Sequence, residues 1–247
     1  MTKLKTKIVF LCSACGDDFP KWNGQCPSCK EWGTLSEFKV SSKKKRRKTE
    51  IRESKFLPDV LSGAPIERIP TGLKEADRVL GGGLLSGALV LLGGSPGVGK
   101  STLALHICSG IDRKALYISA EESEEQIALR ARRLNVKPDH LHLSGENELD
   151  GIITHIERIS PELVVIDSIQ TVMNSSLDSL PGSPSQIRDC GQRLLEISKQ
   201  KNVTILIVGH VTKDGTIAGP KMLEHMVDTV LYMDGDDRYD HRILRSA

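Results

Sequence analysis

Residues 94–101 read GSPGVGKS, and this stretch decides the fold. It matches the phosphate-binding pattern GxxxxGK[ST] in full, and it lies between the apolar run ALVLLG and the helical pattern STLALHI, as the motif requires. Its glycines let backbone N–H groups turn onto phosphate oxygens, Lys100 reaches the β- and γ-phosphates, and the Ser101 hydroxyl coordinates Mg²⁺. The sequence therefore predicts a site for ATP and Mg²⁺. The expected contacts are Gly94, Ser95, Pro96, Gly97, Val98, Gly99, Lys100, Ser101 and Thr102.

Three carboxylates extend the predicted nucleotide site. Asp167 ends the apolar run LVVI, so we expect it at the carboxyl edge of a buried strand, as a Mg²⁺ ligand beside the loop. Glu121 and Glu122 follow the run ALYISA and are expected at the same edge, where a carboxylate polarises the attacking water. We favour Glu121, with Glu122 in support. The pair also suits the first turn of a helix, and this alternative stays open.

A histidine is expected at the same edge of the sheet. The run TILIVG leads directly into His210, whose side chain could sense the γ-phosphate. A loop histidine without a role is the alternative. The predicted catalytic residues are Lys100, Glu121, Glu122 and His210.

From about residue 57 onward, short apolar runs alternate with segments of helical periodicity. Nearly continuous apolar strands such as LVVI suit a sheet buried on both faces, and helical crossovers make that sheet parallel. The ending MVDTVLYMDGDDRYDHRILRS indicates an antiparallel hairpin at the sheet edge. The predicted fold class is α/β with a mostly parallel sheet. Strands are expected near 88–92, 115–119, 141–143, 163–166 and 203–208, and helices near 101–111, 123–134, 149–159 and 185–201.

Four cysteines form two CxxC pairs, Cys12 with Cys15 and Cys26 with Cys29, and ten residues separate the pairs. Two such knuckles supply four thiolates in a tetrahedron, which predicts a closed, structural Zn²⁺ site rather than a catalytic one. Redox chemistry at either pair is the alternative, but no thioredoxin-like βαβ pattern surrounds them.

Composition divides the chain into a zinc ribbon over 1–38, a basic flexible linker over 39–56 and an ATPase domain over 57–247. The linker contains six consecutive basic residues and has no hydrophobic periodicity, so we expect it to stay unfolded. Both tryptophans, Trp22 and Trp32, lie in the ribbon. We expect them to pack around the metal centre, and stacking on nucleic-acid bases is the alternative.

Charge is distributed unevenly along the chain. Residues 1–55 hold 14 Lys/Arg against 6 Asp/Glu and carry +8, whereas the remainder carries −6, so an anionic partner should meet the N-terminal end first. No apolar stretch approaches the roughly 20 residues that span a bilayer, and the first apolar run is too short for a signal peptide. We therefore expect a cytoplasmic protein without membrane contact.

These blocks together resemble the bacterial RadA (Sms) family of recombination proteins. The resemblance runs through essentially the whole chain and rests on FPKWNGQCPSCKEWGTL, IPTGLKEADRVLGGGLLSG, the phosphate-binding loop, YISAEES, LVVIDSIQT and GHVTKDGTIAGPKMLEHMVDTVLYMDGD. It implies a RecA-like P-loop ATPase core, DNA-stimulated ATP hydrolysis, binding of single-stranded and branched DNA, homo-hexameric rings, and branch migration of intermediates made by a RecA-type recombinase. It also implies that SIQT with its continuation and TKDGTIAGPKMLEHM face DNA, with Lys213 and Lys221 as candidate phosphate contacts.

The sequence departs from the family at its end. Family members continue with a KNRFG segment, implicated in coupling ATP turnover to DNA, and with a C-terminal domain similar to that of Lon proteases. This sequence stops at Ala247, which leaves translocation and a stable hexamer open. Two other functions remain as alternatives. One is a regulatory ATPase or kinase similar to KaiC, and the other is a truncated chain that binds nucleotide, zinc and DNA with little turnover.

Overall fold

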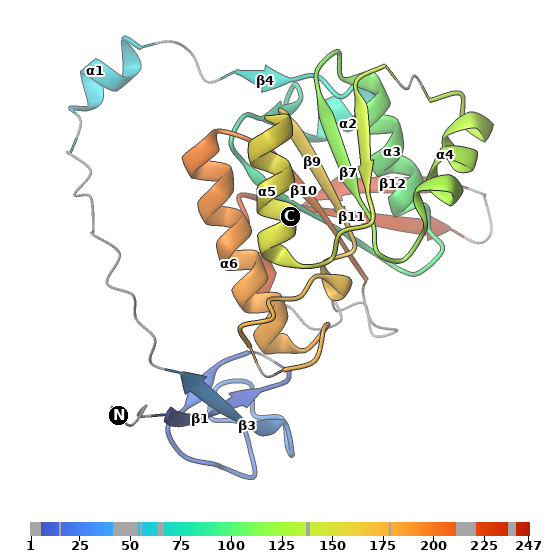
Figure 1. The fold of residues 1–247 in the computed structure, drawn as a ribbon. Helices are drawn as coiled ribbons and strands as arrows, with labels where there is room; N and C mark the ends of the chain where they lie inside the picture. Colours follow the sequence, from blue (N-terminus) through green and yellow to red (C-terminus); the bar gives the residue numbers. More distant parts are fainter. Residues whose placement is uncertain are drawn as a thin grey trace.

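The computed structural model describes residues 6–14, 16–41, 54, 56–63, 67–136, 139–177, 179–210, 221–236 and 241–247. Seven of the described strands form one sheet of order β12-β11-β6-β10-β9-β7-β8 (Figure 1). All neighbours from β11 to β8 are parallel, whereas β12 runs antiparallel to β11 at the edge, which confirms the predicted terminal hairpin. The strands are β6 Leu89–Gly94, β7 Ala115–Ile118, β8 Leu141–Ser144, β9 Leu163–Asp167, β10 Thr204–His210, β11 Thr229–Asp236 and β12 His241–Ser246.

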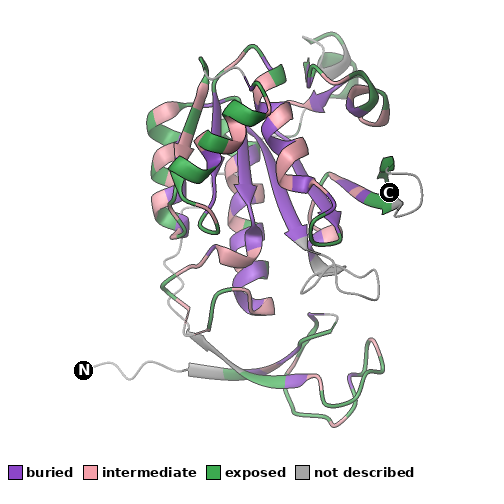
Figure 2. Cartoon of the chain, turned by 90° about the vertical axis from the view of Figure 1, so that its right-hand side faces the viewer, coloured by how far each residue is buried: buried purple, intermediate pink, exposed green. Residues whose placement is uncertain are grey.

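The central strands are buried on both faces, as their continuous apolar runs require (Figure 2). In β6, Val90 and Leu92 join the hydrophobic cluster on one face, while Leu89 and Leu91 join the cluster on the other. Successive side chains of a strand point to opposite faces, so one apolar run supplies both clusters. Each fully buried Leu or Ile contributes about 1.5–3 kcal/mol relative to an exposed one.

Four helices supply the other half of these clusters, two on each face of the sheet (Figure 1). Helices α3 and α4 cover the face of Val90, and α5 and α6 cover the face of Leu89. A capping box closes the start of α4, because Ser123 accepts from the Gln126 N–H and the Gln126 side chain accepts from the Ser123 N–H. These helices are α3 Lys100–Gly110, α4 Glu124–Arg133, α5 Leu149–Ile159 and α6 Pro184–Lys201.

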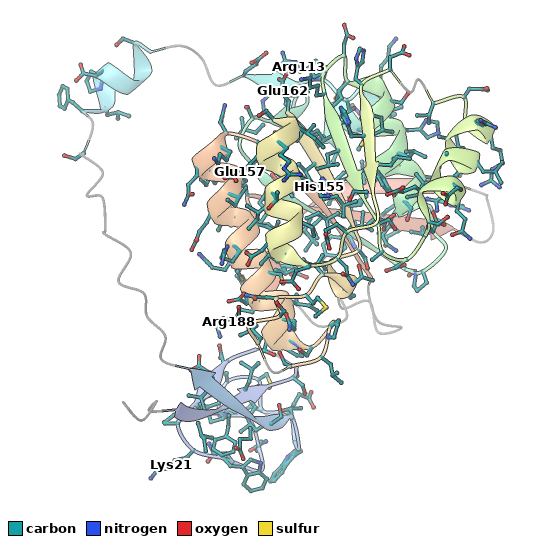
Figure 3. All side chains as sticks on the ribbon, in the orientation of Figure 1. Lys21, Arg113, His155, Glu157, Glu162 and Arg188 are labelled. Carbon is teal, nitrogen blue, oxygen red and sulfur yellow. The ribbon has the colours of Figure 1, made fainter. Side chains whose placement is uncertain are left out.

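The N-terminal ribbon is a small antiparallel sheet of order β2-β1-β3. It lies beside the first turn of α6, where Arg188 Nη1 donates to the Gly16 carbonyl at 3.3 Å and pairs with Asp18 Oδ1 at 3.5 Å (Figure 3). The ribbon strands are β1 Thr6–Cys12, β2 Asp18–Phe19 and β3 Leu35–Ser41. The remaining elements are α1 Leu57–Leu61, β4 Arg68–Ile69, α2 Lys74–Val79, β5 Leu84–Leu85, the 3-10 turn η1 Ile169–Thr171 and α7 Lys221–Glu224.

The two tryptophans do not pack around the metal centre, contrary to the expectation from sequence. Trp22 is 60% exposed and Trp32 is 74% exposed. The small cluster inside the ribbon is instead built from its cysteines together with Leu35, Phe10 and Phe19. Within the part of the chain that the structure describes, no helix combines the length and apolar character needed to cross a bilayer.

Candidate nucleotide and metal sites

The phosphate-binding loop connects β6 to α3 at the carboxyl edge of the sheet. Gly97 and Gly99 adopt φ values of 78° and 111°, a backbone conformation that residues with a Cβ rarely adopt. Gly99 is also the residue that precedes the first turn of α3, so the unpaired N–H groups of that turn open toward the loop. This combination of backbone donors and a helix N-terminus suits an anion such as a phosphate.

Lys100 is held inside the loop. Its side chain is 4% exposed, and Nζ donates to the Gly94 carbonyl at 2.9 Å and to the Ser95 carbonyl at 3.0 Å. Burial lowers the pKa of Lys100, while the nearby negative charges of Asp167 and Glu121 oppose that shift. A phosphate oxygen would offer this ammonium a stronger acceptor than either carbonyl.

Asp167 ends β9 and is 6% exposed. The hydroxyl of Tyr117, a fully buried residue of β7, donates to Asp167 Oδ2 at 2.5 Å. Burial, and then the charge of Asp167, raise the pKa of Tyr117 far above its ordinary value, so the hydroxyl remains a donor at any working pH. The bond fixes the orientation of the carboxylate across two neighbouring strands.

The two glutamates after β7 point to different partners. Ser168 Oγ donates to Glu121 Oε1 at 2.5 Å, and Glu121 is close enough to influence the pKa of Lys100. Glu122 forms an ion pair with Arg130 of α4, and its backbone N–H donates to Ser119 Oγ at 3.3 Å. Glu121 therefore belongs to the group around Lys100 and Asp167, whereas Glu122 is paired with the last turn of α4.

His210 is placed only through its backbone. Its Cα is the register partner of Gly94, which brings the end of β10 beside the start of the phosphate-binding loop. For His210 and for Lys221 the structure describes the backbone but not the side chain. Cys15 and Lys213 lie outside the described residues.

The terminal hairpin supports the loop from the other side, a contact that sequence reasoning missed. Arg242 Nε, on β12, donates to the Val98 carbonyl at 3.1 Å. On β11, the Met233 carbonyl lies so close to Gly94 that a Cβ there would clash with it. Neither contact has a local sequence signal, because more than one hundred residues separate the partners.

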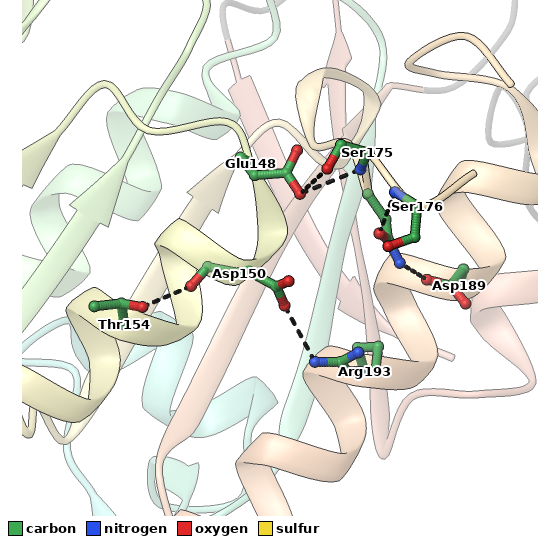
Figure 4. Close-up of polar contacts among 8 residues, drawn as sticks. Glu148, Asp150, Thr154, Ser175, Ser176, Asp189 and Arg193 are labelled. Carbon is green, nitrogen blue, oxygen red and sulfur yellow. Dashed lines mark hydrogen bonds and ion pairs between the residues drawn. The ribbon is translucent and has the colours of Figure 1, made fainter. Parts of the chain in front are cut away.

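The loop after β9 is tied to α5 and α6, the two helices on its face of the sheet (Figure 4). Its first residues are among those that the family resemblance assigns to DNA. Glu148, which precedes α5, accepts from the Ser175 N–H at 3.2 Å and from its hydroxyl at 3.1 Å. On α6, Asp189 Oδ2 accepts from Asn174 Nδ2 of the loop at 2.8 Å. Asp150 and Arg193 also join α5 to α6, at 3.4 Å. This loop therefore has a fixed position at the same edge of the sheet as the phosphate-binding loop.

The ribbon gathers three cysteine sulfurs within 4.8 Å of one another, those of Cys12, Cys26 and Cys29. Cys12 Sγ and Cys29 Sγ are 3.7 Å apart. Four sulfurs in a tetrahedron around zinc, each about 2.3 Å from the metal, would be separated by about 3.8 Å. The thiolate set and its spacing fit a structural Zn²⁺.

The two knuckles have the same backbone pattern. The Cys12 N–H donates to the Asp17 carbonyl and the Cys12 carbonyl accepts from the Gly16 N–H, each at 2.9 Å. The Cys26 N–H donates to the Glu31 carbonyl at 2.8 Å, and the Cys26 carbonyl accepts from the Lys30 N–H at 3.0 Å.

A parallel sheet of this order, with a glycine-rich loop between β6 and α3 and an acidic residue at the end of β9, defines a P-loop ATPase with a RecA-like fold. The chain belongs to the AAA domain family, whose model matches residues 52–216. A second model, the rubredoxin metal binding domain, matches residues 10–37.

Curated relatives carry the name DNA repair protein RadA. The chain is 46% identical to that of Listeria monocytogenes over 253 residues, and 48% identical to that of Rickettsia bellii over 248 residues. These alignments cover 100% and 98% of this chain but 55% of each relative, so the chain spans about half their length. The predicted family resemblance is confirmed.

A solved structure, a KaiC-like protein from Pyrococcus horikoshii, matches with a TM-score of 0.60 over 73% of this chain and 87% of its own. The two sequences are 20% identical, so the likeness concerns the fold alone.

Proposed function

We propose that this chain is a DNA-stimulated ATPase that acts on recombination intermediates, binding single-stranded and branched DNA. The observation that carries the proposal is the gathering of Lys100, Glu121 and Asp167 at one edge of the sheet, where Asp167 and Glu121 together influence the Lys100 pKa. The DNA substrate is supported by the name of the relatives, DNA repair protein RadA.

Each residue of the nucleotide site has a proposed role. The N–H groups of the loop over residues 94–102, apart from Pro96, which has none, bind the phosphates together with the Lys100 ammonium, and Lys100 neutralises charge on the transferred group. Ser101 and Asp167 would hold Mg²⁺, which supplies Lewis-acid polarisation of the phosphate oxygens when bound. Glu121 orients and polarises the attacking water, while Glu122 positions α4 through Arg130. His210 stays the candidate sensor of the γ-phosphate.

The ribbon is proposed to hold one structural Zn²⁺ through Cys12, Cys15, Cys26 and Cys29. Thiolates are the ligands that zinc prefers in closed sites, and four of them leave no position for a reacting water. Metal binding supplies roughly 10–16 kcal/mol in small zinc modules, which replaces the apolar core that the ribbon is too small to build. A RecA-type recombinase and further copies of the chain are the proposed protein partners.

The proposed activity is tested by measuring ATP hydrolysis by the zinc-loaded chain with and without single-stranded DNA, beside Lys100→Ala. A Lys100-dependent rate that rises with DNA is the expected result. A flat rate with intact nucleotide binding would show that coupling to DNA needs parts beyond this chain. Transfer of labelled γ-phosphate to the protein itself would instead favour the kinase activity of a KaiC-like protein.

A further inference from the structure

The two tryptophans form a paired surface on the ribbon. They are the only tryptophans of the chain, and both are more than half exposed. A Cβ placed on Gly24 would lie 3.5 Å from Trp32 Cζ3 and 3.8 Å from Trp22 Cη2. Edge atoms of both rings therefore lie within van der Waals reach of the same point of the backbone, at Gly24.

The ribbon backbone holds this pair in place. Gln25 and Trp32 form an antiparallel bridge, and the Gly33 N–H donates to the Gly24 carbonyl at 2.8 Å. The residues that carry the rings flank the second cysteine knuckle, so metal binding would restrain both of them. Exposed apolar side chains that are contiguous mark interaction surfaces, and tryptophan is enriched among the residues that dominate binding energy.

We propose that Trp22 and Trp32 form a stacking platform for unpaired bases of single-stranded DNA. This inference rests on the proposed function and assigns part of its DNA binding to the ribbon rather than to the ATPase domain. Every base offers a π-face, so two adjacent indoles bind a single strand without reading its sequence. A duplex offers no such faces, because its bases are already stacked on one another.

The sequence on either side of the ribbon, rather than the ribbon itself, favours an anionic occupant such as a nucleic acid. Residues 1–55 carry +8, and Lys21, the neighbour of Trp22, lies on the side of the ribbon away from the ATPase domain (Figure 3). Within residues 16–37, however, two lysines stand against four acidic residues. The affinity supplied by the rings should therefore come from stacking, and it should change little with salt, unlike phosphate contacts.

Intrinsic fluorescence tests the proposal directly, because tryptophan emission of this chain reports on the ribbon alone. We expect an oligo(dT) strand to quench the emission of the zinc-loaded chain in a saturable way, and the matching duplex to leave it unchanged. By anisotropy of a labelled oligo(dT), the double variant Trp22→Ala, Trp32→Ala should bind at least about fivefold more weakly, by a similar factor at low and high salt.

Two further variants separate stacking from folding. Trp22→Phe with Trp32→Phe keeps an aromatic face at each position and should restore most of the affinity. Gly24→Leu keeps both indoles but places a bulky side chain against the edges of both rings, and it should weaken binding. Zinc content measured for each variant identifies any that fails to fold.

The platform would be refuted if oligo(dT) left the emission of the unmodified chain unchanged and the double alanine variant bound oligo(dT) with equal affinity. If DNA still stimulated ATP hydrolysis in that case, the proposed function would stand. Absence of both DNA binding and stimulation would refute the proposed function as well. Emission that changes on dilution of the protein, and not with oligo(dT), would assign the pair to contact between copies of the chain and would also refute the platform.

Discussion

At the scale of single residues, Tyr117 is the buried donor that orients the proposed magnesium ligand. Tyr117→Phe removes the hydroxyl that donates to Asp167 and keeps the packing of the ring. Loss of a residue that orients a metal ligand costs about 10- to 100-fold in metal affinity. We therefore expect the Mg²⁺ concentration for half-maximal ATP hydrolysis to rise about tenfold, measured by titrating Mg²⁺ at saturating ATP.

Tyr232→Phe is the matched control for this prediction. The Tyr232 hydroxyl also donates to a carboxylate, Glu224 Oε1, at 2.6 Å, but on the terminal hairpin. Tyr232→Phe should therefore leave the Mg²⁺ concentration for half-maximal ATP hydrolysis unchanged. An equal shift in both variants would mean that Tyr117 affects the site only through general stability.

The adjacent glutamates allow a second comparison at this scale. Glu121→Gln removes the carboxylate that lies near Lys100, and we expect kcat to fall about 100-fold or more while ATP still binds. Glu122→Gln removes only the partner of Arg130, a partly exposed pair worth about 1 kcal/mol or less, so kcat should change little. Steady-state ATP hydrolysis and binding of a fluorescent ATP analogue measure both effects. A larger loss of kcat in Glu122→Gln would reverse the assignment.

At the scale of elements, the hairpin of β11 and β12 stabilises the phosphate-binding loop. Arg242→Ala removes the donor to the Val98 carbonyl, a hydrogen bond worth about 1 kcal/mol. The loop should then be less ordered before nucleotide binds, and the Kd for ATP should rise about fivefold. Arg245→Ala is the control, since Arg245 pairs with Asp234 and lies over the Tyr232 ring. Equal ATP affinity of the wild-type chain and Arg242→Ala would contradict this role for the hairpin.

At the scale of the whole molecule, the secondary-structure elements could be predicted from the sequence, because short-range patterns specify them. The five parallel-strand runs, the four long helices and the terminal hairpin all follow from apolar runs and periodicity. The contacts of Tyr117 with Asp167 and of Arg242 with Val98 could not be predicted, because they depend on which strands become neighbours. The packing of Trp22 and Trp32 around the metal centre was predicted wrongly, since composition does not tell which side of a small ribbon faces water.

The ribbon contacts α6 through the side chain of Arg188. Among the described residues, Arg188 of α6 donates to the Gly16 carbonyl and forms an ion pair with Asp18, both in the ribbon. Both side chains of the ion pair are about half exposed, so the pair contributes about 1 kcal/mol or less. From a contact of this strength, we expect the ribbon to lie beside α6 in most molecules and to detach in the others.

Charge reversal at this contact should release the ribbon. In Arg188→Asp, two carboxylates face each other, and we expect faster rotational motion of the ribbon, measured by the decay of tryptophan anisotropy. The double variant Arg188→Asp, Asp18→Arg restores opposite charges and should slow that motion again. If the decay is the same in all three chains, the ribbon is held by contacts other than this pair. If only the double variant recovers the slow decay, the pair itself sets the orientation of the ribbon over the edge of the sheet that carries the nucleotide site.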